Sequence, residues 1–427
     1  MSSSIVLLFL LFLVILFTGI PVAYGMGVWT IISFAVLGGD YSVIPQKLFN
    51  GIDSYSYVCV LLFILTAEIM SNGEITKDIV EFCESLVGHI RGGLAHVNVL
   101  ASMLFAGLSG SAAADASGLG PIEIEIMRKG GYQKDFSCAV TAASAIIGPI
   151  IPPSTIMIVF VGCVGQVSIA KMFLGGIGPG ILLGIAYMIL CYVYALKNDI
   201  PLSSEGFSWK RVEKALIHTL PALILPLLIM GSIVLGICTA VESSAIAATY
   251  AIVVAICRKK LTLKQFFRCC IRSAKSAANV MLIIAIASAM GWAITTLQVA
   301  KIFTEFCLAF ITSKWGFLLL MNILLLIIGM FLDASPALLV MVPILYPVAL
   351  KYGINVVHFG VVVCFNLMVG TLTPPVGMML FIISNVGKIE LSVLYKKIVP
   401  FVAVAIVVLL LITYVPVTVT LLPTLLG

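Results

Sequence analysis

Long apolar runs separated by short polar stretches cover the whole sequence. The runs exceed the roughly 9–11 residues of a transmembrane β-strand and do not alternate between apolar and polar positions. This pattern excludes a membrane β-barrel and predicts a bundle of transmembrane helices, whose backbone is satisfied within each segment. We expect a short helix over 4–17, a break at Gly19–Pro21, and unbroken helices over 22–37, 55–71, 170–196, 219–237, 240–257, 278–297 and 398–420.

Four further apolar regions are interrupted by glycine, serine or proline. Small residues allow the chain to turn sharply, and proline removes a backbone donor and frees a carbonyl. The first and third regions are predicted to be re-entrant hairpins, and the second and fourth to be broken helices. The regions, each followed by its break, are 93–128 (107–111), 135–165 (148–154), 315–350 (333–336) and 357–386 (370–375).

The polar segments divide the chain. Residues 40–50 interrupt the apolar pattern, and residues 199–214 form the longest polar stretch, which we expect to link two halves. Residues 74–88 have one apolar and one charged helical face, which predicts an amphipathic helix in the membrane interface. The basic stretch 258–275 predicts a second interfacial helix.

A shift of 222 residues superimposes the two broken regions of the sequence. Ten positions are identical over about 50 without a gap, including Gly107 with Gly329 and Pro152–Pro153 with Pro374–Pro375. Shared helix-kink chemistry is the alternative to a true repeat. Five predicted crossings lie between the copies, so the second copy is expected to be inverted. Inverted repeats with interrupted helices are typical of secondary transporters.

Composition and charge support a membrane protein. Hydrophobic residues make up 62% of the 427, and charged residues make up 10%, against about 25% in soluble domains. The net charge of +6 is dispersed, which gives no sign of a nucleic-acid partner. The eleven cysteines lie mostly in apolar runs and indicate neither a disulfide framework nor a zinc site. Of the 24 Lys and Arg residues, 19 fall on one side of the predicted topology, which places both termini outside.

The candidate ligands lie at the four breaks, where hydroxyls and freed carbonyls can coordinate a hard cation such as Na⁺. We expect each hairpin tip to bind Na⁺ together with the broken helix of its own repeat. The ligands predicted in the first copy are Ser109, Gly110, Ser111, Gly148, Pro149 and Pro152, and those in the second are Asp333, Ser335, Gly370, Thr371 and Thr373. The residues expected to shape the breaks are Gly107, Pro153, Gly329, Pro336, Pro374, Pro375 and Gly377.

A substrate carboxylate is predicted between the two tips, near Ser111, Ser154 and Asp333. No Lys or Arg falls in the motifs, so binding would rest on hydroxyls, on amides at a helix N-terminus and on bound Na⁺. A carboxylate at Asp333 would repel the substrate unless a cation lies between them.

Several residues allow a second interpretation. Asp115 is expected to be functional because a carboxylate at membrane depth is costly. Asp333 and Glu242 could instead be helix N-caps, and Glu68 could pack on a helix face. Ser109 lies in a Gly-x-Ser-Gly pattern, which leaves an intramembrane serine protease as a rival, although such an enzyme needs a histidine base within reach. A stand-alone ion channel is another rival.

The motifs GLSGSAAAD (107–115), GPIIPPS (148–154), GMFLDASP (329–336) and GTLTPPVG (370–377), with the opening TGIPVAYGMG, resemble the large membrane subunit of tripartite ATP-independent periplasmic (TRAP) transporters. The resemblance covers essentially the whole chain. It implies an elevator-type fold, Na⁺-driven uptake, and no organic cofactor. It also implies a small four-helix membrane (Q) subunit and a periplasmic substrate-binding (P) protein as partners.

The resemblance further implies a bacterial inner-membrane location and a small carboxylate substrate, such as sialic acid or a C4-dicarboxylate. A stand-alone divalent-anion/Na⁺ symporter of related fold is the alternative within the same class. The predicted division is a first-repeat scaffold and arm (1–92), a first transport part (93–168), scaffold helices with a linker and arms (169–314), a second transport part (315–386), and an arm with a C-terminal helix (387–427).

Overall fold

Helices alone build the protein across the residues that the structure describes. The structure is a computed structural model that describes residues 8, 10–12, 14–15, 20–71, 75–198, 200, 206–259, 261–311 and 313–426. These ranges contain no β-strand. Seven of their helices are long and apolar enough to cross a membrane, or eight if one bent pair is a single span. This is the predicted all-α polytopic membrane fold; the helix expected over 4–17 and residue 19 of the break after it lie largely outside the described residues.

The first half of the chain forms helices α2 to α11 with one short 3₁₀ helix, η1. Their bounds are α2 (Val22–Leu37), α3 (Val43–Ile52), η1 (Tyr55–Tyr57), α4 (Val58–Ser71), α5 (Ile75–Val87), α6 (Gly93–Ser109), α7 (Ala112–Gly118), α8 (Gly120–Lys129), α9 (Lys134–Ala145), α10 (Thr155–Val164) and α11 (Ile169–Lys197).

The second half forms helices α12 to α21. Their bounds are α12 (Trp209–Val234), α13 (Ala240–Cys257), α14 (Leu263–Thr296), α15 (Val299–Phe310), α16 (Lys314–Phe331), α17 (Ala334–Lys351), α18 (Val356–Leu372), α19 (Met378–Gly387), α20 (Leu391–Tyr414) and α21 (Val417–Leu426).

The shift of 222 residues relates the helices of the two halves well beyond the broken motifs. It carries the start of α6 from 93 to 315, next to the start of α16, and the start of α9 from 134 to 356, where α18 begins. The same shift brings α2 onto α13, α5 onto α15, α10 onto α19 and α11 onto α20. Most of α12 has no equivalent among the described residues, because the shift carries residue 8, the first described one, to 230 near the end of this helix. Helix α12 therefore lies largely between the two copies.

Two predicted segments differ from the structure. Residues 40–50 are not merely an interruption, because most of them form α3, which meets the helix after it at an angle of 58°. The basic stretch 258–275 is not a separate interfacial helix. Thr262 and Gln265 form a capping box that starts α14, and no glycine–proline break follows, so the arm and the span are one helix of 34 residues.

Three other features also differ from the prediction. Helix α15 was not expected, although it occupies the position equivalent to the amphipathic α5. The linker ends earlier than expected, because α12 begins at Trp209 within the polar stretch. The last expected helix, 398–420, in fact begins at Leu391 and divides after Tyr414 into α20 and α21.

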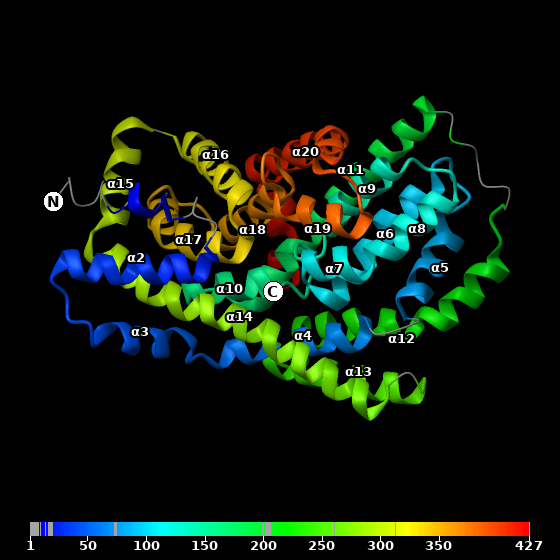
Figure 1. Cartoon of the computed structure of the whole chain (residues 1–427), viewed down its shortest axis with the longest axis horizontal. Helices are drawn as coiled ribbons and strands as arrows, with labels where there is room; N and C mark the ends of the chain where they lie inside the picture. The colour runs from blue at the N-terminus through cyan, green and yellow to red at the C-terminus, as the bar shows by residue number, and fades with distance from the viewer. Residues whose placement is uncertain are drawn as a thin grey trace.

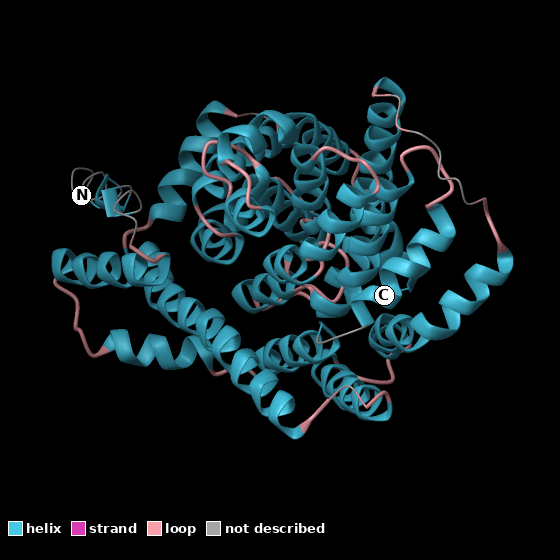
Figure 2. Ribbon diagram, turned by 45° about the vertical axis from the view of Figure 1, so that its right-hand side comes forward, coloured by secondary structure: helices cyan, strands magenta, loops and turns pink. Residues whose placement is uncertain are grey.

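The helices pack as an elongated outer layer and a compact bundle. Helix α14 runs across the molecule with α2 and α3 packed along it, while α4 packs against both α13 and α14 (Figure 1). The hairpins and broken helices gather on one side of this layer, as the turned view also shows (Figure 2). Below, the outer layer with α5 and α12 is called the scaffold, and the bundle of α6–α10 and α16–α19 is called the transport bundle.

Segments predicted to lie on one side of the membrane contact each other. The Arg258 guanidinium lies 2.5 Å from the Asp78 carboxylate, and the Lys397 ammonium lies 3.3 Å from the Asp135 carboxylate. The Arg91 side chain donates to the carbonyl of residue 200 at 3.3 Å. These bonds join pairs of segments that are far apart in sequence and that the charge-based topology predicts to lie on the same side of the membrane.

A buried amide network lies inside each half of the transport bundle. In the first copy, Asn98 donates to Thr141 and accepts from Ser144, both at 2.7 Å. In the second copy, Asn366 donates to Asn322 at 2.9 Å. Each network joins the first limb of a hairpin to the first half of a broken helix, so those two elements are held together in both copies.

Candidate functional site

The first hairpin turns at Gly110, whose φ of +59° suits glycine. A side chain there would also collide with the neighbouring break, since a Cβ would lie 2.2 Å from the Pro153 carbonyl oxygen. Ser111 follows as the N-cap of α7, and its hydroxyl accepts from the Ala114 amide at 3.4 Å. The tip is therefore a tight turn seated directly on the broken helix of its own copy.

The first broken helix leaves residues 146–154 between α9 and α10. The Thr155 amide donates to the Gly110 carbonyl at 3.4 Å, which ties the break to the tip. Ser154 caps α10 by accepting from the Met157 amide at 3.3 Å, and its hydroxyl donates to the Pro149 carbonyl. Ser154 is completely buried by these contacts, so the residue expected beside a substrate is turned inward and Thr155 takes the open position.

The second hairpin and broken helix repeat this arrangement. The Gly377 amide donates to the Met330 carbonyl at 3.0 Å, at a position that corresponds to the Thr155 bond of the first copy. Gly329 and Gly370 pack backbone to backbone, since a Cβ on Gly370 would lie 2.7 Å from the Gly329 Cα. Each tip therefore lies against the break of its own repeat.

Asp333 occupies the N-cap position of α17, which begins at Ala334 rather than at Pro336. Its side chain makes no standard capping bond, but it accepts from the Ala334 amide at the start of the helix and is exposed to the pocket described below. The two roles expected for Asp333, at a helix N-terminus and at the pocket, are therefore compatible. Glu242, in contrast, closes a capping box with Thr239, whose amide donates to it at 2.8 Å.

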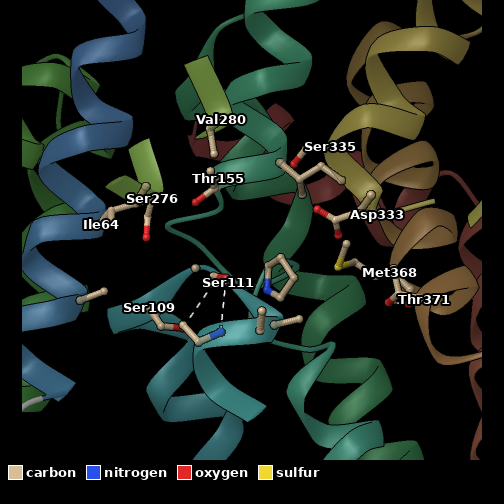
Figure 3. Close-up of a pocket in the computed structure, with 18 of the residues that line it drawn as sticks. Ile64, Ser109, Ser111, Thr155, Ser276, Val280, Asp333, Ser335, Met368 and Thr371 are labelled. Atoms are coloured by element: carbon tan, nitrogen blue, oxygen red, sulfur yellow. Dashed lines mark hydrogen bonds between the residues drawn. The ribbon is translucent and has the colours of Figure 1, made fainter. Parts of the chain in front are cut away.

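Both tips open onto one pocket between the scaffold and the transport bundle, with a cavity volume of about 240 Å³. Ser111 lies below it and Asp333 to its right in Figure 3, and the Asp333 carboxylate points into the pocket. The polar residues that line it are Glu68, Ser71, Ser109, Ser111, Thr155, Ser276, Asp333, Ser335 and Thr371.

The predicted ligands differ in their access to this pocket. Gly110 and Pro149 line it with the hydroxyl residues just given. Gly148 and Gly370 are buried at helix contacts instead. The Thr371 and Thr373 hydroxyls donate to the Met368 and Val369 carbonyls, each at 2.7 Å, which leaves their oxygen lone pairs for another partner.

Two carboxyl groups lie buried inside the first hairpin. Ser109 donates to one oxygen of Asp115, while the other oxygen has no partner and lies where a Cβ on Gly148 would be. Glu123 accepts from Ser102 and also has one unpartnered oxygen. A shift of 222 places alanine and leucine at the equivalent positions, so these two acids occur in the first hairpin only.

Sequence reasoning found Asp115 but missed Glu123. The segment Ile122–Met127 alternates glutamate with apolar residues, and no pattern distinguishes the buried Glu123 from Glu125, which pairs with Lys129 at the surface. The bond from Ser102 was the only signal, and it requires the packing of α6 against α8.

The Gly-x-Ser-Gly pattern does not form a hydrolase site. The Ser109 hydroxyl donates to the Asp115 carboxyl rather than to a histidine ring. His358 contacts the Ile412 carbonyl at 2.9 Å on another part of the bundle.

The chain matches a known protein family over most of its length. Residues 9–418 match the family described as the DctM component of tripartite ATP-independent periplasmic transporters. The chain belongs to this family. Its DctM relatives include the sialic acid TRAP transporter permease protein SiaT of Haemophilus influenzae, 38% identical over 100% of this chain and 69% of the relative.

Two further relatives are named after two different substrates, sialic acid and C4-dicarboxylates. The large permease protein SiaM of a sialic acid TRAP transporter of Vibrio cholerae is 37% identical over 96% of both chains. The large permease protein DctM of a C4-dicarboxylate TRAP transporter from the same species is 34% identical over 99% of this chain and 98% of the relative. The chain is therefore a TRAP transporter large permease subunit, a multi-pass membrane transporter and not an enzyme.

A solved structure supports the fold alone. The YdaH transporter of Alcanivorax borkumensis aligns with a TM-score of 0.66 at 13% identity, over 89% of this chain and 88% of that one. The family description names a three-part transporter, so this DctM component is one part of an assembly.

Proposed function

We propose that this permease imports a small organic carboxylate together with Na⁺ by an elevator movement of the transport bundle against the scaffold. The observation that carries the proposal is the single pocket at which both hairpin tips meet, each closed against the break of its own copy. Symmetric tips of this kind present backbone carbonyls and hydroxyls to one space near the middle of the fold.

The two Na⁺ sites would each combine a tip with its break. The first would use Ser109 to Ser111 with the residues from Gly148 to Pro152, and the second would use Asp333 to Ser335 with the residues from Gly370 to Thr373. The threonine hydroxyls support this arrangement because their protons are already donated to helix carbonyls. Hydroxyl and carbonyl oxygens are suitable ligands for a hard cation.

The substrate carboxylate would lie between the tips, beside Ser111, Thr155 and Asp333. Thr155 takes the role first assigned to Ser154, because Ser154 is buried. Bound Na⁺ would separate the substrate from the Asp333 carboxylate and supply the positive charge that the pocket side chains lack.

Small residues support an elevator movement at the boundary between the scaffold and the transport bundle. Gly107 meets the ring of Pro226 on α12, where an added Cβ would lie 2.6 Å from the ring. Gly162 on α10 meets Tyr57 in the same way, at 2.2 Å from its hydroxyl. Glycine at these two positions lets the two bodies approach each other closely along this boundary.

The assembly would include a small four-helix membrane (Q) subunit and a periplasmic substrate-binding (P) protein. The complex would lie in a bacterial inner membrane with both termini of this chain on the periplasmic side. The excess of Lys and Arg on one side of the predicted topology supports the orientation. A stand-alone symporter of related fold would need neither partner.

Uptake in proteoliposomes that contain the chain and both partners tests the proposal. N-acetylneuraminate and succinate should each be offered with an inward Na⁺ gradient, with K⁺ in place of Na⁺, and with ATP added. We expect uptake of one of these acids only with the Na⁺ gradient. Uptake at full rate without Na⁺, or uptake that requires ATP, would contradict it.

A further inference from the structure

The pocket has a polar wall on its scaffold side that the tips do not supply. Helix α4 contributes Glu68 and Ser71, and α14 contributes Ser276. Ser276 faces the tips across the cavity, beside the apolar side chains of Ile64 and Val280 (Figure 3). A substrate held at the tips by its carboxylate therefore extends toward a carboxylate and two hydroxyls.

The charge of this wall is opposite to what a second substrate carboxylate needs. Among the described residues that line the pocket, Glu68 and Asp333 are the only charged ones, and no Lys, Arg or His is present. Bound cations at the tips can neutralise Asp333 and a substrate carboxylate there. Glu68 lies on the scaffold, away from the tips, so a second carboxylate beside it would face a like charge in a partly desolvated cavity.

Hydroxyl groups fit the same wall. An ionised glutamate only accepts hydrogen bonds, so Glu68 requires donors from its partner. Serine hydroxyls donate or accept and adapt to several hydroxyl positions. A chain of hydroxyls would therefore satisfy Glu68, Ser71 and Ser276 together, and a charge-assisted bond to Glu68 would be the strongest of these contacts.

We propose that the pocket selects an acid with one carboxylate and several hydroxyl groups, and that Glu68 on the scaffold rejects dicarboxylates. This inference rests on the proposed function, because it assumes that the substrate carboxylate lies at the tips with Na⁺. It distinguishes between the acid classes that the names of the relatives include, and it assigns the choice to a residue outside the repeat motifs.

Ligand binding to the purified full-length chain in detergent provides the test, measured by calorimetry in NaCl and in KCl. The probes are gluconate and N-acetylneuraminate as hydroxylated monocarboxylates, succinate as a dicarboxylate, and butyrate as a monocarboxylate without hydroxyls. The variants are Glu68→Ala and Glu68→Lys. Glu125→Gln is the control, because Glu125 lies at the surface and pairs with Lys129.

We expect Na⁺-dependent binding of gluconate or N-acetylneuraminate, with succinate and butyrate at least about ten-fold weaker, the difference that one charge-assisted hydrogen bond provides. Glu68→Ala should weaken the binding of the hydroxylated acid by about ten-fold. Glu68→Lys should allow succinate to bind, which a variant that merely unfolds cannot do. Glu125→Gln should match the wild type.

The outcomes separate the two proposals. Succinate binding as tight as that of the hydroxylated acids, or unchanged selectivity in Glu68→Ala, would overturn the role of Glu68 and leave Na⁺-coupled transport standing. Equal binding in NaCl and KCl, or no binding of any probe, would overturn the proposed function and the inference with it.

Discussion

The contact between Gly329 and Gly370 yields a quantitative prediction for Gly370→Ala. The new Cβ would lie 2.7 Å from the Gly329 Cα and 2.8 Å from its carbonyl carbon, whereas ordinary contact begins at 3.4 Å. Both atoms belong to the backbone of α16, so no side chain can rotate away. The second tip and its break must separate by about 0.7 Å, the difference between 2.7 Å and 3.4 Å.

Overpacking of a buried site by one methyl group destabilises a protein by about 1–3 kcal/mol. The same movement would displace Thr371 from the second tip and spoil the proposed Na⁺ site. We therefore expect a lower melting temperature in detergent and a Na⁺ requirement for uptake raised by about ten-fold, which corresponds to about 1.4 kcal/mol.

Gly291→Ala is the matched control. Gly291 lies within α14, where an added Cβ meets nothing within 4 Å, so alanine should leave the protein unchanged or stabilise it by up to about 1 kcal/mol. If Gly370→Ala had wild-type stability and wild-type Na⁺ dependence, the close approach of tip and break would not define the site.

Three further variants test other contacts. Asp333→Ala should abolish uptake without loss of folded protein, because it removes a proposed cation ligand; wild-type uptake with unchanged Na⁺ dependence would refute that role. Asn366→Leu leaves Asn322 without its donor and should destabilise the chain by about 1–3 kcal/mol in thermal unfolding, and no change would show that the network is dispensable. Arg258→Met should lower stability by about 1 kcal/mol by breaking the bond to Asp78, and the loss should shrink in high salt; a salt-independent difference would point to packing instead.

Much of the fold was predictable because the breaks are encoded by residue type. The helix expected over 22–37 has those bounds in the structure, and so does the one over 240–257. Both hairpins and both broken helices lie where glycine and proline placed them. Apolar length and backbone breakers are local properties, so a single sequence carries them without reference to the packing.

The segments that were predicted wrongly depend on packing between distant helices. Residues 43–52 contain polar side chains at Gln46 and Lys47, and their helix becomes evident only through its contact with α14. The first copy bends after Ile52, whereas the equivalent segment of the second copy continues as the single helix α14. The apolar pattern is similar in the two segments and does not show this difference. The strongly apolar helices were therefore predictable, but helix continuity and the helices α3 and α15 were not.

The site was predictable to within a residue at the tips and not at all on the scaffold. The tip residues Ser111 and Asp333 were expected from the repeat. Thr155 lines the pocket in place of the predicted Ser154, because Ser154 is the N-cap of α10 and its side chain turns inward. Glu68 was expected only as a residue that could pack on a helix face, because nothing in its neighbourhood indicates that α4 faces the tips.

Helix α12 determines whether the number of membrane crossings before the second copy is odd or even. In the proposed topology, α2, the α3–α4 pair, the α9–α10 pair and α11 each cross the membrane once, while the first hairpin returns to its starting side. Those four crossings alone would make the second copy parallel to the first, and α12 is the fifth. The two-fold relation that brings both tips to one pocket therefore depends on a helix that contributes no described residue to that pocket.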